Sequence, residues 1–282
     1  MIDLITVVFR DEIPLLQIQA QSIAEYIPAG ELNSIIVVVN DSADVVDLID
    51  TAWWKQYQDR VRISVRTFES RINGWESQQL CKLLAASQAE CKWSVVLDTK
   101  TWFVRPFAML DIVDSQGRPR VGFGRLNKIG IEDHTRHYIE NLYRLNELPH
   151  VIGPAGVPFF FHTETVKNMI SEHDDFVEFF QTNVRYPNLI TEFVLYSGYV
   201  KSKYGSFDVL YDTISIPPFI ALNIADYEAP DFDYRFNLIV TEPKVLTASL
   251  HRKAYAQLSP EQLARWQDFL IDRKLTVTKF TF

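Results

Sequence analysis

Strand-like segments alternate with helix-like segments over the first 107 residues, and this alternation restricts the fold more than any other feature of the sequence. Runs rich in β-branched residues are expected to form strands at 2–9, 35–39, 61–68 and 93–97. Apolar residues at helical spacing between them predict helices at 13–26, 43–58 and 75–90. Strands that are joined through helices lie parallel to one another. We therefore expect an α/β protein with a mostly parallel central sheet flanked by helices.

The third predicted strand differs in texture from the others. Arg60, Arg62 and Arg66 alternate with apolar residues along 61–68, so one side of this strand is basic. Such alternation is typical of a strand at the edge of a sheet, where one face contacts water.

The second half of the chain is less regular. Strands are expected at 121–126 and 245–250, with strand and turn at 206–219, and helices at 132–145, 164–181, 189–204 and from Ser259 onward. The aromatic segment 150–162 reads as a loop that leads into a strand, 225–237 as a mobile surface loop, and the tail 276–282 as an edge strand.

Polar residues follow three of the four predicted strands. Arg10 comes after the first, Asn40 and Asp41 after the second, and Asp98 ends the fourth, with Lys100 two residues later. Because the carboxyl ends of parallel strands share one edge, we expect these side chains to gather where α/β sheets bind ligands. Turn capping and surface pairing are the alternative explanation for the same residues.

Composition narrows the class of ligand. The 282 residues carry a net charge of −8, which disfavours general nucleic-acid binding because that function requires a basic surface.

Two cysteines, Cys81 and Cys91, suggest no disulfide framework and fit a reducing, cytoplasmic setting. The apolar start of the chain is expected to be a strand rather than a signal peptide, and no apolar run reaches the roughly 20 residues of a transmembrane helix.

Several short motifs are spread from about residue 5 to residue 270. They read VVFR, VVNDS, GWESQQLCKL, VVLDTKTWFVRPF, GPAGVPFFF, TEFVLYSGYV and HRK. Together these motifs resemble those of glycosyltransferases of the GT-A fold, in particular a bacterial and phage group of similar length. The resemblance implies a Rossmann-like single domain over 1–282, with a nucleotide-binding half at 1–107 and an irregular acceptor-side half at 108–282 that ends in a helix. It also implies a nucleoside-diphosphate sugar, such as a UDP-sugar, as donor and a glycan or glycoconjugate hydroxyl as acceptor.

The resemblance also implies roles for individual residues. Asp98, Lys100 and Glu192 are expected to be catalytic, with Glu192 as the base that deprotonates the acceptor hydroxyl. The donor is expected to contact Phe9, Arg10, Asn40, Asp41, Lys82, Asp98, Thr99, His251 and Lys253. The acceptor is expected to contact Trp75, Gln79, Gly153, Pro154, Ala155 and Gly156. Ordinary packing, solvated lysines, helix-dipole effects and plain turns are the alternatives for these positions.

One departure from the family pattern concerns the metal. GT-A enzymes usually carry Asp-any-Asp, whose last carboxylate holds Mn²⁺ or Mg²⁺, whereas this chain has Lys100 at that position. A divalent ion plus a carboxylate contributes about one positive charge, as does a lysine ammonium. We hypothesise that Lys100 replaces the ion beside the leaving diphosphate. A metal held by Asp98 and His251 is the alternative, whereas His134 and His137 are expected to be a surface pair.

Two other functions compete with sugar transfer. A nucleotidyltransferase on a similar sheet would need a glycine-rich phosphate loop after the first strand, and VVFRDEIP contains no glycine. A nucleotide-sugar-binding protein that has lost turnover together with the second carboxylate is the other alternative.

Overall fold

The computed structural model describes residues 1–68, 74–125, 133–148, 150–152, 157–213, 222–224 and 232–275. Its central sheet has five strands in the order β3-β2-β1-β4-β8. The strands span Ile2–Val8 (β1), Leu32–Val39 (β2), Val61–Val65 (β3), Trp93–Asp98 (β4) and Phe159–His162 (β8). The first four are parallel, and β8 runs antiparallel to β4. The predicted α/β class and the edge position of the third strand are confirmed.

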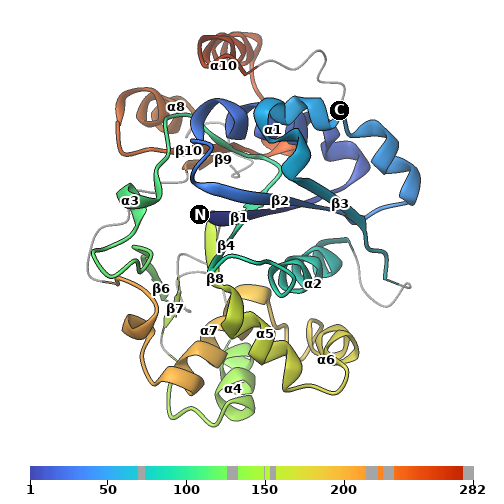
Figure 1. The fold of residues 1–282 in the computed structure, drawn as a ribbon, viewed down its shortest axis with the longest axis vertical. Helices are drawn as coiled ribbons and strands as arrows, with labels where there is room; N and C mark the ends of the chain where they lie inside the picture. Colours follow the sequence, from blue (N-terminus) through green and yellow to red (C-terminus); the bar gives the residue numbers. More distant parts are fainter. Residues whose placement is uncertain are drawn as a thin grey trace.

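Helices cover both faces of this sheet (Figure 1). One face carries α1 (Ile13–Tyr26), with the 3-10 segments η1 (Arg10–Glu12), η2 (Ala43–Leu48) and η3 (Thr51–Arg60) nearby. The other face carries α2 (Gly74–Ala86), which contacts α5 (Thr163–Ser171), α6 (Phe176–Asn183) and α7 (Glu192–Tyr204). Beyond α7 lie α4 (Asp133–Leu142) and the small sheet of β6 (Phe123–Arg125) and β7 (His150–Ile152). Helix α2 therefore lies along the chain between the edge strand β3 and strand β4, which pairs with β1 and β8.

The helix predicted at 43–58 is wrong. The segment forms η2 and η3, separated by extended residues, and Lys55 has non-helical angles inside η3. Aspartate and valine recur here, and these residues favour caps and extended backbone over α-helix interiors. Asp50 illustrates this, because its carboxylate caps η3 by accepting from the amide of Ala52. Trp54 and Tyr57 of this segment are nevertheless fully buried.

Boundaries in the second half also differ from the predictions. The helix expected at 164–181 is split into α5 and α6, because Asp175 caps a new helix by accepting from the amide of Glu178. The helix expected at 189–204 begins at Glu192, where Thr191 is the N-cap. Within 206–213 the chain forms η5 (Phe207–Val209) and no strand. Residues 214–219 and the predicted tail strand at 276–282 lie outside the described residues.

Part of the predicted loop 225–237 is a helix. Helix α8 spans Phe232–Thr241, and the rings of Phe232 and Phe236 are stacked at 5.4 Å between centroids. Both side chains are buried, which explains why this aromatic segment folds instead of facing water. Residues 225–231 lie outside the described part of the chain.

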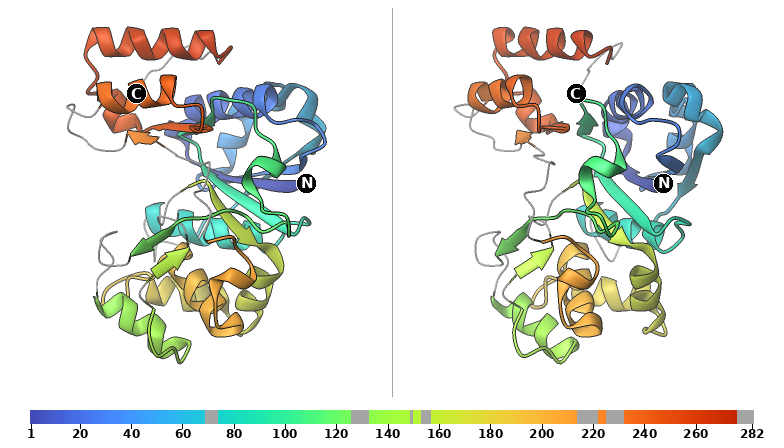
Figure 2. Two further views of the ribbon diagram at one scale, coloured as in Figure 1. Left: turned by 90° about the vertical axis from the view of Figure 1, so that its left-hand side faces the viewer. Right: turned by 60° about the vertical axis from the view of Figure 1, so that its left-hand side comes forward.

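The C-terminal segment packs back onto the first half of the chain. Strand β10 (Thr247–Leu250) pairs with β5 (Thr101–Phe103), a strand that the sequence analysis did not predict, and with β9 (Leu222–Ile224). A second apolar core fills the space between α1, α8 and α10 (Pro260–Asp272), with Trp102 and Trp266 fully buried in it. Ser259 caps α10 in a capping box, as predicted. Figure 2 shows α8 and α10 at the end of the molecule opposite α4–α7. The division of a single domain into halves at 1–107 and 108–282 stays a prediction.

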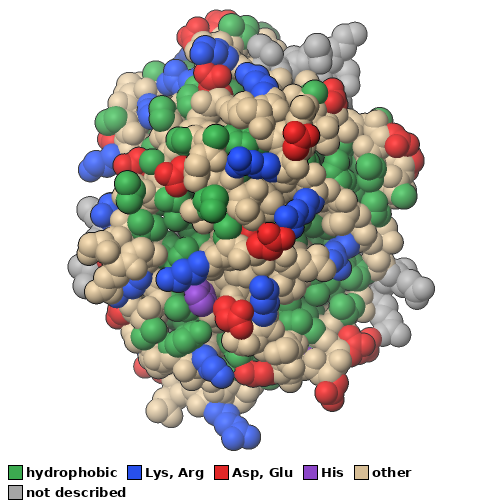
Figure 3. Space-filling model, in the orientation of Figure 1, with side chains coloured by type: hydrophobic (Ala, Val, Ile, Leu, Met, Phe, Trp, Pro, Cys, Tyr) green, Lys and Arg blue, Asp and Glu red, His purple; other side chains and the backbone are tan. Residues whose placement is uncertain are grey.

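The molecular surface carries both signs of charge. On the face shown in Figure 3, lysine and arginine side chains are interspersed with aspartate and glutamate rather than gathered in one patch. Among the described residues, no helix combines the length and the apolar character that crossing a membrane requires.

Helices α4 and α7 approach closely at Gly198. A β-carbon at this glycine would lie 2.3 Å from Ile139 Cγ2 and 2.9 Å from Tyr143 Cδ2, closer than real atoms come. Because Ile139 is fully buried, it has little room to yield.

Gly198→Ala is therefore expected to destabilise the protein. Overpacking costs about 1–3 kcal/mol, and the 2.3 Å approach to a fully buried side chain places this site in the upper part of that range, about 2–3 kcal/mol. The better helix propensity of alanine returns about 1 kcal/mol, so we expect a net fall of about 1–2 kcal/mol in the free energy of unfolding measured with urea. Gly30→Ala is the control, because nothing lies within 4 Å of its added methyl group, and its effect should stay below about 0.5 kcal/mol. Equal effects of the two substitutions would contradict the close helix contact.

The carboxylate of Asp3 in β1 forms hydrogen bonds to β2 and to the residues just before β4, at the amino-terminal ends of these strands. Asp3 is fully buried, and its carboxylate accepts from Asn33 Nδ2 (2.8 Å), Ser34 Oγ (2.6 Å) and the amides of Glu90 (2.8 Å) and Cys91 (2.7 Å). Burial alone would raise the pKa of Asp3, but these hydrogen bonds outweigh it and lower the pKa.

Asp3→Asn is expected to lower the free energy of unfolding by about 1–3 kcal/mol at neutral pH, because the new amide presents N–H groups to two backbone N–H donors. Since the native pKa of Asp3 is lowered, its stabilising effect is complete above the unfolded pKa of about 4 and is lost as the pH falls through the native value. Urea unfolding at a series of pH values should show the gap between wild type and variant narrowing below about pH 4. A gap that is independent of pH would refute the role of the ionised carboxylate.

Candidate functional site

Polar residues gather at the carboxyl edge of the parallel sheet. Asp98 ends β4 and lies in register with Val7 of β1. Next to it, the amide of Asn40 donates to the carbonyl of Val8 at 2.9 Å, so the ends of β1 and β2 are also joined here. The strand order reverses between β1 and β4, which is where open α/β sheets bind their ligands. Asp98 and Asn40 therefore share one edge at the switch point of the sheet.

The side chains of the first two strand ends are tied to one another. The amide of Arg10 donates to Asp41 Oδ2 at 3.0 Å, and the Arg10 guanidinium pairs with Asp44 at the surface. Asn40 Nδ2 donates to Ser77 Oγ of α2 at 2.7 Å. In this arrangement Arg10 and Asp41 partly satisfy each other, as the capping alternative suggested, and their contact with a nucleotide stays a prediction.

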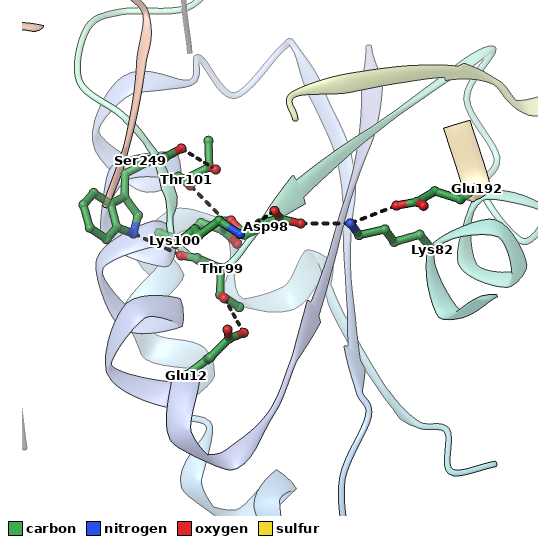
Figure 4. A network of polar contacts seen from close by, with 10 residues as sticks. Glu12, Lys82, Asp98, Thr99, Lys100, Thr101, Glu192 and Ser249 are labelled. Carbon is green, nitrogen blue, oxygen red and sulfur yellow. Dashed lines mark hydrogen bonds and ion pairs between the residues drawn. The ribbon is translucent and has the colours of Figure 1, made fainter. Parts of the chain in front are cut away.

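A row of four charged side chains runs from the protein interior to this edge (Figure 4). Lys82 Nζ of α2 lies 3.2 Å from Glu192 Oε1 of α7 and 2.9 Å from Asp98 Oδ1. Lys100 Nζ lies 2.8 Å from the other oxygen of Asp98, Oδ2. The side chains of Glu192 and Lys82 are 5% and 6% exposed, whereas those of Asp98 and Lys100 are 16% and 19% exposed. The charges thus alternate in sign and end with a cation at the accessible side.

The two lysines keep Asp98 ionised. Burial alone would raise the pKa of Asp98, but the charges of Lys82 and Lys100 outweigh burial and hold that pKa well below its usual range. Burial would likewise lower the pKa of Lys82, but Asp98 and Glu192 outweigh it and raise that pKa. Lys82 and Asp98 are therefore both charged in the folded protein at neutral pH.

Glu192 occupies a different environment at the buried end of the row. Its burial raises its pKa above the ordinary value, although Lys82 opposes this shift. Its backbone amide, in the first turn of α7, faces Gln79 Oε1 of α2 at 3.3 Å. A raised pKa suits a general base, but the carboxylate is almost fully buried and already paired with Lys82. The base role stays a prediction.

The turn between β4 and β5 carries Asp98 and Lys100, and its backbone is fixed from α1. Gln19 of α1 is fully buried, and its Nε2 donates to the carbonyls of Asp98 (2.7 Å) and Thr101 (3.0 Å). The C-terminal segment holds the turn from the other side. Thr101 Oγ1 lies 2.7 Å from Ser249 Oγ, and the amide of Leu250 donates to the carbonyl of Lys100 at 3.2 Å.

The second residue of the turn is anchored as well. Thr99 Oγ1 donates to Glu12 Oε2 at 2.6 Å, and the carbonyl of Thr99 accepts from Trp102 Nε1 at 3.1 Å. Thr99 is buried, and both its hydroxyl and its carbonyl form hydrogen bonds within the protein. Together these bonds fix the backbone of the turn, so the position of Lys100 is set before any ligand arrives.

The residues predicted to bind the acceptor fall into two groups. Trp75 is 62% exposed, so it does not belong to the core. It follows Gly74, the first residue of α2, whose carbonyl accepts from Asn40 Nδ2 at 3.3 Å and which lies against the ring of Phe9. Gln79, one turn further along α2, is buried beside Glu192. Gly153, Pro154, Ala155 and Gly156 lie outside the described residues.

Of the late basic residues, His251 is half-buried, whereas Lys253 is placed only by its backbone. His251 directly follows β10, next to the bond between Leu250 and Lys100, and Lys253 lies in the short helix α9 (Arg252–Tyr255). The side chain of Lys253 lies outside the described part of the chain.

The described residues do not fit a divalent ion at Asp98. Each oxygen of its carboxylate already faces an ammonium group, and a cation there would be repelled by both lysines. Within the described part of the chain, no three His, Cys, Asp or Glu side chains come together as metal ligands. His137 instead pairs with Glu140 of the same helix at 3.2 Å and is exposed, as expected for a surface residue.

Sequence reasoning did not identify Glu12, Gln19 and Ser249 as residues of the site. Glu12 ends the segment Arg10–Glu12 that follows the first strand, and this position near the carboxyl edge of the sheet was a signal for it. A glutamine on the core-facing side of the first helix was a second signal, because a buried amide requires polar partners. For Ser249 the sequence carries no comparable signal, since its partner lies 148 residues away.

Comparisons with known proteins address the fold. The chain matches an active-site mutant of LgtC with a TM-score of 0.51 at 11% identity, covering 96% of this chain and 95% of LgtC. It also matches the bifunctional glycosyltransferase WbbM (TM-score 0.45, 12% identity, 98% of this chain) and the glycosyltransferase GlyE of Streptococcus pneumoniae TIGR4 (0.49, 13%, 97%). The chain spans 50% of the WbbM chain and 62% of the GlyE chain. The likeness to LgtC shows a fold of the GT-A type.

No curated protein matches this sequence. Residues 3–227 match the sequence model of a family of unknown function, DUF6492. The matched residues include the parallel sheet from residue 3 onward, α2, α7 and the turn that carries Lys100. The chain therefore belongs to the DUF6492 family, here with a GT-A-type α/β fold.

Proposed function

We propose that this protein is a glycosyltransferase that moves a sugar from a nucleoside-diphosphate sugar to an acceptor hydroxyl, in the synthesis of a surface glycan or glycoconjugate. The observation that carries the proposal is the fixed turn with Asp98 and Lys100 at the switch point of a GT-A-type sheet. The ammonium of Lys100 at this edge of the sheet suits an anionic diphosphate. The neighbouring solved glycosyltransferases support the reaction class by their fold alone.

In this proposal Lys100 stabilises the leaving diphosphate. As the bond between the sugar and the diphosphate breaks, negative charge grows on the phosphate oxygens, and a fixed ammonium lowers the energy of that transition state. Lys100 is partly exposed and its backbone is fixed, so its charge is in place before the reaction. Asp98 orients this ammonium through the 2.8 Å contact at Oδ2. The exposed Trp75 gives the acceptor sugar an aromatic surface close to the same edge.

The donor class is tested with a panel of UDP-, GDP- and CMP-sugars. We expect the purified protein to release nucleotide from at least one nucleoside-diphosphate sugar, slowly with water and faster when a glycan acceptor is added, as measured by coupled nucleotide detection. Tight binding of a nucleotide sugar with no turnover would favour the binding-protein alternative. Absence of both binding and turnover across the panel would refute the proposal.

Lys100→Met should lower kcat by about 10²–10³, the usual cost of removing one preorganised charge partner from a transition state. Lys100→Arg should retain part of the activity, and Lys203→Met at an exposed position of α7 is the matched control. We also expect turnover to persist in EDTA, since the described site does not fit a divalent ion. Loss of turnover in EDTA with recovery on adding Mn²⁺ would show that Lys100 does not replace a metal.

A further inference from the structure

Lys82 is the least expected member of the charge row. It belongs to α2, yet its ammonium lies between the carboxylates of Asp98 in β4 and Glu192 in α7. Glu192 is 110 residues away from Lys82 in the sequence. Lysine side chains lean toward the amino-terminal end of their helix, which directs Lys82 toward the carboxyl edge of the sheet. At 6% exposure the Lys82 side chain is too buried to be a ligand contact in its own right.

Burying such a group is not required for packing. An apolar side chain of similar size usually serves stability as well as a buried ion pair does, because taking charges out of water is costly. The site therefore needs another reason to hold an ammonium behind Asp98. Asp98 offers that reason, since without Lys82 its single negative charge would cancel the charge of Lys100 at the place where a diphosphate would bind.

We propose that Lys82 and Glu192 are positioning residues of the donor site: Lys82, which lies closer to Asp98 than Glu192 does, offsets most of the local charge of Asp98, so that Lys100 meets the donor diphosphate as a cation that Asp98 only partly compensates, and Glu192 fixes Lys82. This inference rests on the proposed function and gives Glu192 a role through Lys82 instead of the role of base. Neither residue touches the substrate in this assignment. Lys100 contacts the ligand, Asp98 orients Lys100, and Lys82 and Glu192 set the charge and position of Asp98.

The geometry supports each contact in the row from Glu192 to Lys100. Lys82 contacts Oδ1 of Asp98 and Lys100 contacts Oδ2, so the two cations do not compete for one oxygen. Glu192 contacts Lys82 at Oε1, and its amide is held by Gln79 from the same helix as Lys82. The Lys82 ammonium also lies 5.5 Å from the centre of the Phe193 ring, a further favourable contact for a cation.

The decisive variant is the double substitution Lys82→Met with Glu192→Leu. It replaces a buried ion pair by apolar groups, so the fold is expected to survive, which a thermal melt checks. We expect the dissociation constant for UDP, measured by calorimetry in EDTA, to rise at least about tenfold. The double variant leaves the net charge of the site unchanged but removes the cation at Asp98 Oδ1, so that Asp98 compensates Lys100 more fully. A folded double variant that binds UDP as tightly as wild type would show that the pair is purely structural and would overturn the inference.

Glu192→Gln distinguishes the positioning role from the base. Glutamine still offers an oxygen to Lys82, so we expect UDP affinity to be retained and kcat to fall by less than about tenfold. A base would instead show a loss of about 10²–10⁴ in kcat with unchanged UDP affinity, and this outcome would overturn the assignment of Glu192. Glu164→Gln, at an exposed position of α5, is the matched control.

The proposed function fails separately from this inference. If wild-type protein binds neither UDP, GDP nor CMP, the nucleotide site itself is refuted and the variants are not needed. If wild-type protein binds one of these nucleotides and Lys100→Met weakens that binding while the double variant does not, the proposed function stands and only the role of Lys82 and Glu192 falls.

Discussion

The ammonium of Lys82, enclosed between Asp98 and Glu192, is the interaction on which the arrangement of this edge depends. It joins α2, the end of β4 and the start of α7, which come from three distant parts of the sequence. None of the three charges is stable alone in so buried a place, because each needs an opposite charge to replace the water it has lost. The row therefore folds as a unit, and it fixes how α7 meets the sheet at the point where a ligand is expected.

The sheet itself followed from the sequence because its rules are local. Continuous β-branched runs at 2–9, 35–39 and 93–97 predict buried parallel strands, and the alternation of Arg60, Arg62 and Arg66 with apolar residues predicts an edge strand. Since parallel strands share one carboxyl edge, the position of Asp98 beside the ends of β1 and β2 could also be predicted. Helix boundaries were less predictable where side-chain caps compete with helical periodicity, as at Asp50 and Asp175.

The core of the candidate site could be predicted only in part. Asp98 and Lys100 stand out in the sequence because they end an apolar strand, whereas Lys82 looks like any lysine on a helix. Only the three-dimensional packing of α2 against α7 reveals that Lys82 is buried between two carboxylates. The supports of the turn were hidden for the same reason, because Gln19 and Ser249 are ordinary polar residues until a distant segment meets them.

Strand β10 has a consequence for how the protein is made. Its Ser249 and Leu250 hold the turn that carries Lys100, and β10 pairs with β5. The ribosome adds these residues about 150 positions after the turn, when the parallel sheet has already been synthesised. The parallel sheet can thus assemble during synthesis before this support of the turn exists, so the nascent chain completes the edge only after residue 250 has been added.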